Sequence, residues 1–191
     1  MLNKLRKLQN KKGFTLVELI VVIAIIAILT AVIVPLVGRY SAQATYSTLQ
    51  DGAKTVSNSI STSLADVTKL GTVLSVSKIT GQKASGTLTI AVLDGAGADK
   101  TSNAAYAKLV TSVKNALESA VDDGAYFAAA VTSNTCSAAI YSKNQDVTGY
   151  TGTGATQDTS FPDDEAYMWN SKAVGLAGNW KPSAAPAATT V

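Results

Sequence analysis

The sequence predicts an α+β fold in which a long N-terminal helix packs, through its second half, on an antiparallel β-sheet with a second, shorter helix. Three features lead to this prediction. An apolar run occupies residues 14–37, and apolar residues at helical spacing follow it up to residue 67. Short alternating segments then fill most of residues 72–180, interrupted by one more helical pattern.

The apolar run from Phe14 to Val37 is long enough to cross a membrane. Its conspicuously polar residues are Thr15, Glu18 and Thr30. At about 1.5 Å per residue, a helix of this length reaches roughly 36 Å, against about 30 Å for a bilayer core. Five cations precede the run, which favours a cytoplasmic N-terminus and an exported remainder. We therefore expect a single-pass membrane protein.

The helix is expected to continue past the membrane as an amphipathic segment. Its apolar residues recur every three or four positions, at Leu49, Ala53, Val56, Ile60, Leu64 and Val67. The polar residues between them, Gln50 included, are expected to face water. Gly71 is a natural end for the helix. Pro35 lacks a backbone N–H and is expected to kink the helix.

Six short segments are expected to form the antiparallel sheet. In pairs they are Thr72–Ile79 with Thr87–Leu93, Ala125–Thr132 with Ser137–Lys143, and Ala166–Asn170 with Gly175–Trp180. The first pair is a predicted hairpin with Gly81 and Gly86 in its connection. Residues 149–160 are rich in Gly and Thr and are expected to form a loop.

The second helix is predicted between the first and second strand pairs. Ser102 or Asn103 can cap its start. Its apolar face runs from Tyr106 to Val121, and Gly124 is expected to end it. After the sheet, residues 181–191 are rich in Pro, Ala and Thr, which predicts a flexible tail.

The chain offers little chemistry for catalysis or for a metal site. It has no histidine, so a Ser-His or Cys-His pair is excluded. Gly95-Ala96-Gly97 lacks the rest of a dinucleotide fingerprint and is interpreted as a turn. We predict no catalytic residue, no cofactor and no enzymatic activity. The acidic groups at 122–123 and 163–165 offer oxygen ligands for calcium, but a helix start or a solvated turn explains them equally, and we predict no metal site.

Charge and cysteine content bear on two further properties, nucleic-acid binding and disulfide formation. The formal net charge is +3, but without the five N-terminal cations only 11 of 16 basic residues remain against 13 acidic ones. Nucleic-acid binding is therefore not expected. Cys136 is the single cysteine, so an internal disulfide is impossible and the residue is interpreted as a small buried hydrophobe.

The stretch from Lys11 to Leu19 resembles the N-terminus of a type IV pilin precursor, which carries a class III signal. The matching residues are Gly13, Phe14, Thr15, Leu16, Glu18 and Pro35. Many Gram-negative members of this family have a disulfide-closed C-terminal loop. This chain cannot form such a disulfide, and in this respect it resembles the major pilins of Gram-positive bacteria.

The resemblance implies a processing and assembly site. A prepilin peptidase would cut between Gly13 and Phe14, and Phe14 would then be N-methylated. Glu18 of one subunit would pair with the Phe14 amine of a neighbour during assembly, and the helix before Pro35 would unwind in the filament. The chain would then comprise a leader at 1–13, a membrane and filament-core helix at 14–38, a globular pilin domain at 39–180 and a tail at 181–191.

The expected function is that of a structural subunit, the major pilin, of an extracellular type IV pilus used for adhesion, surface motility or biofilm formation. Its partners would be copies of itself, the peptidase, and the assembly platform and motor in the membrane. Two alternatives are a pseudopilin of a secretion or competence machine and a membrane-tethered binding domain that never polymerises. A cut after Ala42-Gln43-Ala44 by ordinary signal peptidase, or no cut at all, would replace processing at Gly13.

Overall fold

The computed structural model describes residues 14–143, 145–158, 160–161 and 166–181. The chain divides into two compact units, Met1–Ala42 and Gln43–Val191, which we call the N-terminal unit and the C-terminal unit. The predicted leader at 1–13 and the tail beyond Lys181 lie outside the described residues.

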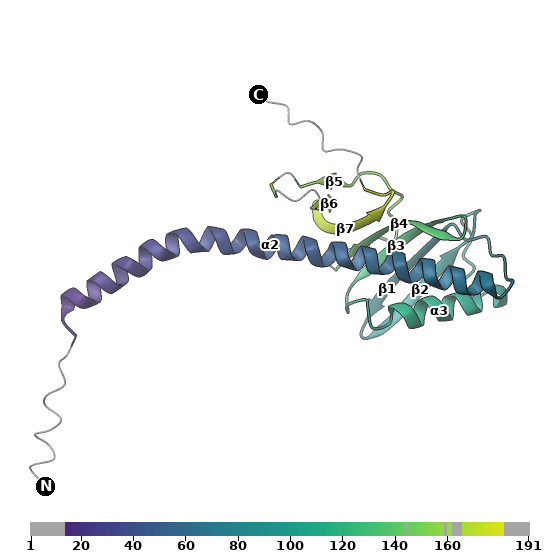
Figure 1. Cartoon of the computed structure of the whole chain (residues 1–191), viewed down its shortest axis with the longest axis horizontal. Coiled ribbons are helices and arrows are strands. Elements are labelled where there is room, and N and C mark those ends of the chain that lie inside the picture. The colour runs from purple at the N-terminus through teal and green to yellow at the C-terminus, as the bar shows by residue number, and fades with distance from the viewer. Residues whose placement is uncertain (1–13, 144, 159, 162–165, 182–191) are drawn as a thin grey trace, which may run out of the picture. The chain divides into compact units, whose positions relative to one another are not determined.

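One helix, α2 (Leu16–Lys69), accounts for all described regular structure of the N-terminal unit and continues into the C-terminal unit (Figure 1). The chain stays helical through Pro35. The missing N–H of this proline therefore removes a hydrogen bond without ending the helix, and the kink stays a prediction.

In the C-terminal unit α2 buries the stripe that its spacing predicted. Its buried apolar residues are Tyr46, Leu49, Ala53, Val56, Ile60, Leu64 and Val67. The expectation that Gln50 faces water was wrong, because its side chain is only 1% exposed. A buried amide needs partners for both its donor and its acceptor, and these come from a distant strand described below.

The C-terminal unit contains a seven-stranded sheet in the order β2-β1-β3-β4-β7-β6-β5. The strands are β1 (Lys78–Ala84), β2 (Thr87–Leu93), β3 (Tyr126–Thr132), β4 (Thr135–Ser142), β5 (Thr156–Gln157), β6 (Tyr167–Trp169) and β7 (Lys172–Gly178). Every neighbouring pair is antiparallel. The predicted α+β architecture of a long helix on an antiparallel sheet is therefore confirmed.

Apolar clusters lie on both faces of the sheet. On one face α2 and the second helix, α3 (Ala107–Leu117), pack against β1–β4 (Figure 1). On the other face the cover comes from connecting segments and from the residues after β7. The cluster there comprises Ala128, Ala138, Ile140, Val147, Tyr150, Tyr167, Val174, Leu176 and Trp180.

The first predicted strand, Thr72–Ile79, was placed too early. β1 begins at Lys78 and continues through Gly81, which had been interpreted as part of the turn. Gly81 is needed inside the strand, because a Cβ there would lie 2.4 Å from the ring of Phe127. The turn is instead made by Ser85 and Gly86, both with positive φ.

The second helix is shorter than predicted. Asn103 is the cap, accepting a hydrogen bond from the N–H of Ala105 at the start of a 3-10 turn, η2 (Ala104–Tyr106), which leads into α3. The helix ends at Leu117 rather than at Gly124. Val121 stays buried without being helical, because apolar spacing reports burial and not the end of the hydrogen-bond ladder.

The later strands occur where they were predicted, with shifted ends. β3 and β4 are joined by Ser133 and Asn134, both at positive φ. β4 begins two residues before the predicted Ser137, and β5 lies inside the segment predicted as a loop. β7 covers Lys172–Gly178 rather than Gly175–Trp180. Cys136 is a buried free cysteine, as predicted.

Candidate functional site at the start of α2

The first turn of α2 holds the carboxylate of Glu18 in a capping box. Thr15 precedes the helix, and its backbone N–H and its hydroxyl both donate to Oε2 of Glu18 at 2.8 Å. In return the N–H of Glu18 donates to the hydroxyl oxygen of Thr15 at 3.2 Å. This reciprocal pair satisfies backbone donors that a helix start otherwise leaves open.

Sequence reasoning missed this role of Thr15, although the signal was present. Thr-x-x-Glu ahead of an apolar run is the sequence signature of a capping box. The consequence is geometric. Glu18 is folded back toward the residue that follows Phe14, so its carboxylate is presented at the very end of the helix rather than along its side.

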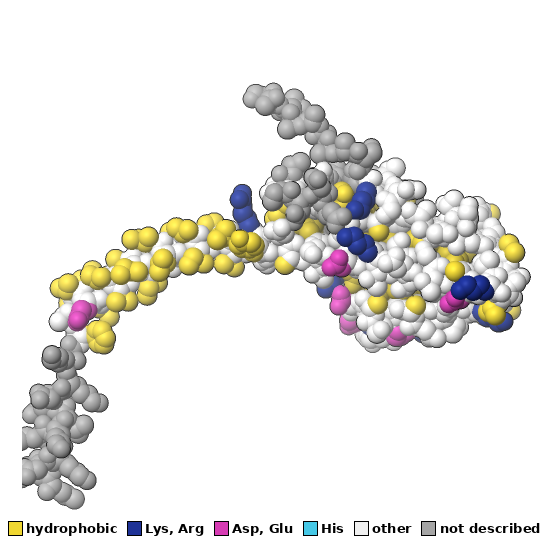
Figure 2. Space-filling model, viewed as in Figure 1, with side chains coloured by type: hydrophobic (Ala, Val, Ile, Leu, Met, Phe, Trp, Pro, Cys, Tyr) yellow, Lys and Arg dark blue, Asp and Glu magenta, His cyan; other side chains and the backbone are white. Residues whose placement is uncertain are grey.

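The rest of the N-terminal unit presents apolar side chains to the outside. Figure 2 shows hydrophobic side chains around this part of α2. The large ones from Phe14 to Tyr40 are all at least 49% exposed. By length and composition α2 is apolar enough to cross a membrane, with a mean hydropathy of 3.3 in its most apolar window.

Two other predicted features of this segment can be placed. The hydroxyl of Thr30 donates to the carbonyl oxygen of Ile26 at 2.7 Å, so this polar side chain is satisfied within its own helix. Pro35 lies within α2. Of the predicted cleavage pair, Phe14 is described and its side chain is 87% exposed, whereas Gly13 lies outside the described residues.

The carboxylates of Asp122 and Asp123 bond to donor groups of the protein itself. Lys143 Nζ lies 2.8 Å from Oδ2 of Asp122, and the hydroxyl of Tyr141 donates to the same oxygen at 3.0 Å. The hydrogen bond from Lys143, followed by that from Tyr141, lowers the pKa of Asp122. Asp123 accepts from the N–H of Gly86. The second acidic group, residues 163–165, lies outside the described residues.

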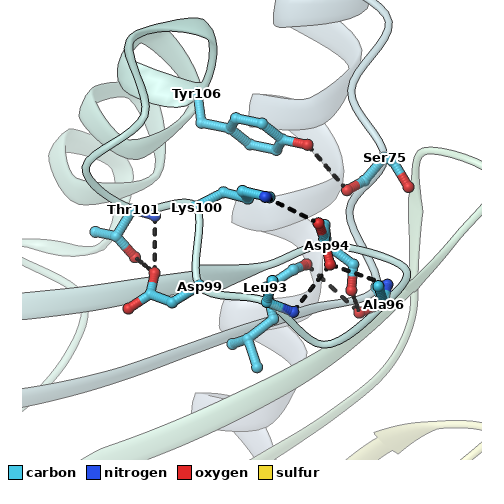
Figure 3. Close-up of polar contacts among 10 residues, drawn as sticks. Ser75, Leu93, Asp94, Ala96, Asp99, Lys100, Thr101 and Tyr106 are labelled. Carbon is cyan, nitrogen blue, oxygen red and sulfur yellow. Dashed lines mark hydrogen bonds and ion pairs between the residues drawn. The ribbon is translucent and has the colours of Figure 1, made fainter.

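The loop after β2 uses its acidic residues in the same way (Figure 3). Oδ1 of Asp94 accepts from the N–H groups of Ala96 and Ala98, each at 2.9 Å, and its other oxygen lies 3.3 Å from Lys100 Nζ. The segment Gly95-Ala96-Gly97 is thus a turn, as predicted. Within the residues that the structure describes, no group of three metal-ligating side chains comes together.

Comparison with known proteins identifies the start of α2 as the informative part of the chain. A family model for the prokaryotic N-terminal methylation motif matches residues 8–34. This class III signal is characteristic of type IV pilins. The match includes Gly13, Phe14, Thr15 and Glu18, and it ends just before Pro35. No curated protein and no solved structure was found to match.

Proposed function

Because the chain carries the N-terminal methylation motif of type IV pilin-like and pseudopilin proteins, we propose that it is the major structural subunit of an extracellular type IV pilus. The observation that carries this proposal is the exposed apolar surface formed by Phe14 and by α2 up to Tyr40, with a single carboxylate at its start. Such a surface needs either lipid or other apolar helices around it. Membrane supplies this cover before assembly, and neighbouring subunits supply it afterwards.

Processing prepares the charge pair. A prepilin peptidase cuts between Gly13 and Phe14, and methylation of the new amine leaves it cationic. In the filament the Glu18 carboxylate of one subunit neutralises the Phe14 amine of the next. Breaking a buried ion pair by removing one partner costs about 3–5 kcal/mol, and this cost would recur at every subunit.

The capping box supports this assignment of roles. The carboxylate of Glu18 already points toward the end of the helix where the new amine is created. The peptidase, the assembly platform and motor, and further copies of the chain are the partners that this function requires. Adhesion, surface motility and biofilm formation would be properties of the assembled fibre.

Shearing experiments on Glu18 variants test the proposal. Glu18→Ala should leave processing and membrane insertion intact and strongly reduce pilin in the sheared fraction relative to the membrane fraction. Glu18→Asp should do less harm. Glu18→Gln is the matched control, because an amide oxygen can still accept from Thr15 but carries no charge. Normal filament yield from Glu18→Gln would contradict the charge pairing and leave only the capping role.

Sequencing the mature N-terminus tests the processing step separately. A chain beginning at Phe14 is expected. A start at Thr45 would indicate ordinary signal peptidase, and an intact Met1 would indicate a plain anchor. If processing occurs at Phe14 but fibres form only on overexpression, a pseudopilin role is favoured instead.

A further inference from the structure

The most unusual contact in the C-terminal unit lies where α2 meets β7. On one edge β7 pairs with β4 from Gly175 to Gly178, and on the other edge it pairs with β6 only from Lys172 to Val174. Beyond Val174 this second edge has no strand neighbour among the described residues. A buried strand edge must find other partners for its N–H and C=O groups.

The side-chain amide of Gln50 takes the place of that missing strand. The N–H of Leu176 donates to Oε1 of Gln50 at 3.0 Å, and Nε2 of Gln50 donates to the carbonyl oxygen of Leu176 at 2.5 Å. Both residues are buried. A primary amide offers one acceptor and a donor side by side, as the backbone of a neighbouring strand does.

The backbone of β7 is suited to this close approach. A Cβ on Gly175 would lie 1.8 Å from the carbonyl oxygen of Leu49 and 2.7 Å from the backbone nitrogen of Gln50. Only glycine admits the helix backbone at this distance. The neighbouring residues on the same strand face are Ala177, which belongs to the apolar cluster beneath α2, and Ala173, which packs against that cluster.

The larger apolar side chains of β7 point the other way. Val174 and Leu176 belong to the cluster on the opposite face of the sheet. On the face toward α2, β7 therefore offers only the small residues Ala173, Gly175 and Ala177. The amide pair at Gln50 supplies the specific attachment.

A second polar contact lies one helical turn earlier on α2. The hydroxyl of Tyr46 donates to Oδ2 of Asp158 at 2.7 Å, and the Tyr46 ring meets Phe161 edge-on with centroids 5.3 Å apart. Asp158 directly follows β5, and its N–H donates to the carbonyl oxygen of Ala166 just before β6. Both contacts thus connect α2 to the same group of strands, β5 to β7.

We propose that Gln50 is a latch that closes the open edge of β7, and that β5, β6 and β7 form a strap that opens from α2 as a unit while β1, β3 and α3 stay folded. The latch is a conformational device of the C-terminal unit and does not depend on the filament function. It predicts that removing one amide changes the opening of β7, whose Leu176 lies 126 residues away in the chain.

Hydrogen exchange of the full-length chain in detergent micelles, resolved to single amides, tests the latch. Gln50→Leu keeps the size of the side chain and leaves both backbone groups of Leu176 without a partner. We expect the amides of β6 and β7 to exchange about 10- to 100-fold faster, while those of β1 and β3 change less than about twofold. Gln50→Glu keeps an acceptor for the N–H of Leu176 but, when ionised, loses the donor to the Leu176 carbonyl, and should give an intermediate effect at Leu176.

Gln82→Leu is the control, since it removes another glutamine that bonds within the sheet, to the hydroxyl of Tyr126. It should leave exchange in β7 unchanged. The latch would be overturned by equal acceleration in β1, β3 and β7, by complete unfolding of Gln50→Leu, or by unchanged exchange at Leu176. Each of those results would mean that the strap does not open as a separate unit under the control of Gln50.

Discussion

The part of α2 in the N-terminal unit and the part in the C-terminal unit differ in where their apolar side chains lie. In the N-terminal unit the large apolar side chains lie around the helix and are exposed, Ile23 for example by 56%. In the C-terminal unit they recur every three or four residues and are buried, with Ile60 at 0% exposure. The difference shows which part the chain covers itself and which part needs cover from outside.

Polar residues follow the same division. In the first part Thr15, Glu18 and Thr30 are satisfied within a turn of their own positions. In the second part Tyr46 and Gln50 bond to residues more than a hundred positions away. A segment that must pass through an apolar environment can depend only on itself, whereas the globular part can use its long-range neighbours.

Deleting residues 1–38 should have the largest effect on the behaviour of the chain. Without the exposed apolar surface, the remainder should be a soluble monomer with mixed helix and strand content and cooperative melting. Size-exclusion chromatography and circular dichroism measure this. Because Cys136 is buried and free, reductant should not change the melting temperature. An aggregated or unfolded product would contradict the division drawn at the end of the apolar run.

A pair of matched truncations sharpens the comparison. Ile60→Ala should destabilise the C-terminal unit by about 2–5 kcal/mol, because it opens a cavity in a packed cluster. Ile23→Ala, the same change in the exposed part, should leave the unfolding free energy of that unit unaltered. Denaturant unfolding of the full chain in detergent compares the two. Equal losses from both variants would show that the two parts are not independent.

Thr15→Ala should have a smaller and local effect. Loss of a helix cap typically costs about 1 kcal/mol, so amides in the first turn of α2 should exchange about five- to tenfold faster. Thr30→Ala is the control, because its hydroxyl only bonds back to Ile26 within the helix. If both variants alter the first turn equally, the capping box at Glu18 is not the cause.

Periodic features of the fold could be predicted from the sequence, and features set by distant contacts could not. The stripe from Leu49 to Val67 was found because burial of a helix face repeats every three or four residues. Gln50 was misassigned to water, since nothing near it in the sequence indicates that Leu176 needs a partner. Gly81 was interpreted as part of a turn. Glycine is required there because the ring of Phe127 leaves no room for a Cβ, and Phe127 lies on another strand.

The candidate site at the start of α2 was also predicted only in part. Glu18 was predicted as a site residue from a short local pattern and its resemblance to pilin precursors. The motif match covers this region, and the role of Glu18 in assembly stays a prediction. The role of Thr15 was equally local and was still missed, because the residue was treated as part of a signal and not as part of a helix. The same four residues, Thr15 to Glu18, thus carry two patterns, a processing signal and a helix cap.

Acidification should have the smallest effect, and the carboxyl that reports it is Asp158 in the C-terminal unit. Burial of the Asp158 carboxyl raises its pKa, but hydrogen bonds from Tyr46 and Ser160 outweigh burial, and the pKa lies below its ordinary value. A carboxyl with a lowered folded-state pKa contributes stability above its unfolded pKa of about 3.9 and loses it as the pH falls below that value.

The stability contributed by Asp158 should therefore decline as the pH falls below about 4. The decline should be less steep in Asp158→Asn, which cannot titrate. Tyr46→Phe removes the hydrogen bond from the Tyr46 hydroxyl to Asp158 and should also flatten the decline. Unfolding midpoints measured across this range compare the three proteins. Other carboxylates titrate in the same window, so the informative quantity is the difference from the normal chain. Parallel curves for all three would mean that the Tyr46–Asp158 contact does not stabilise the folded state.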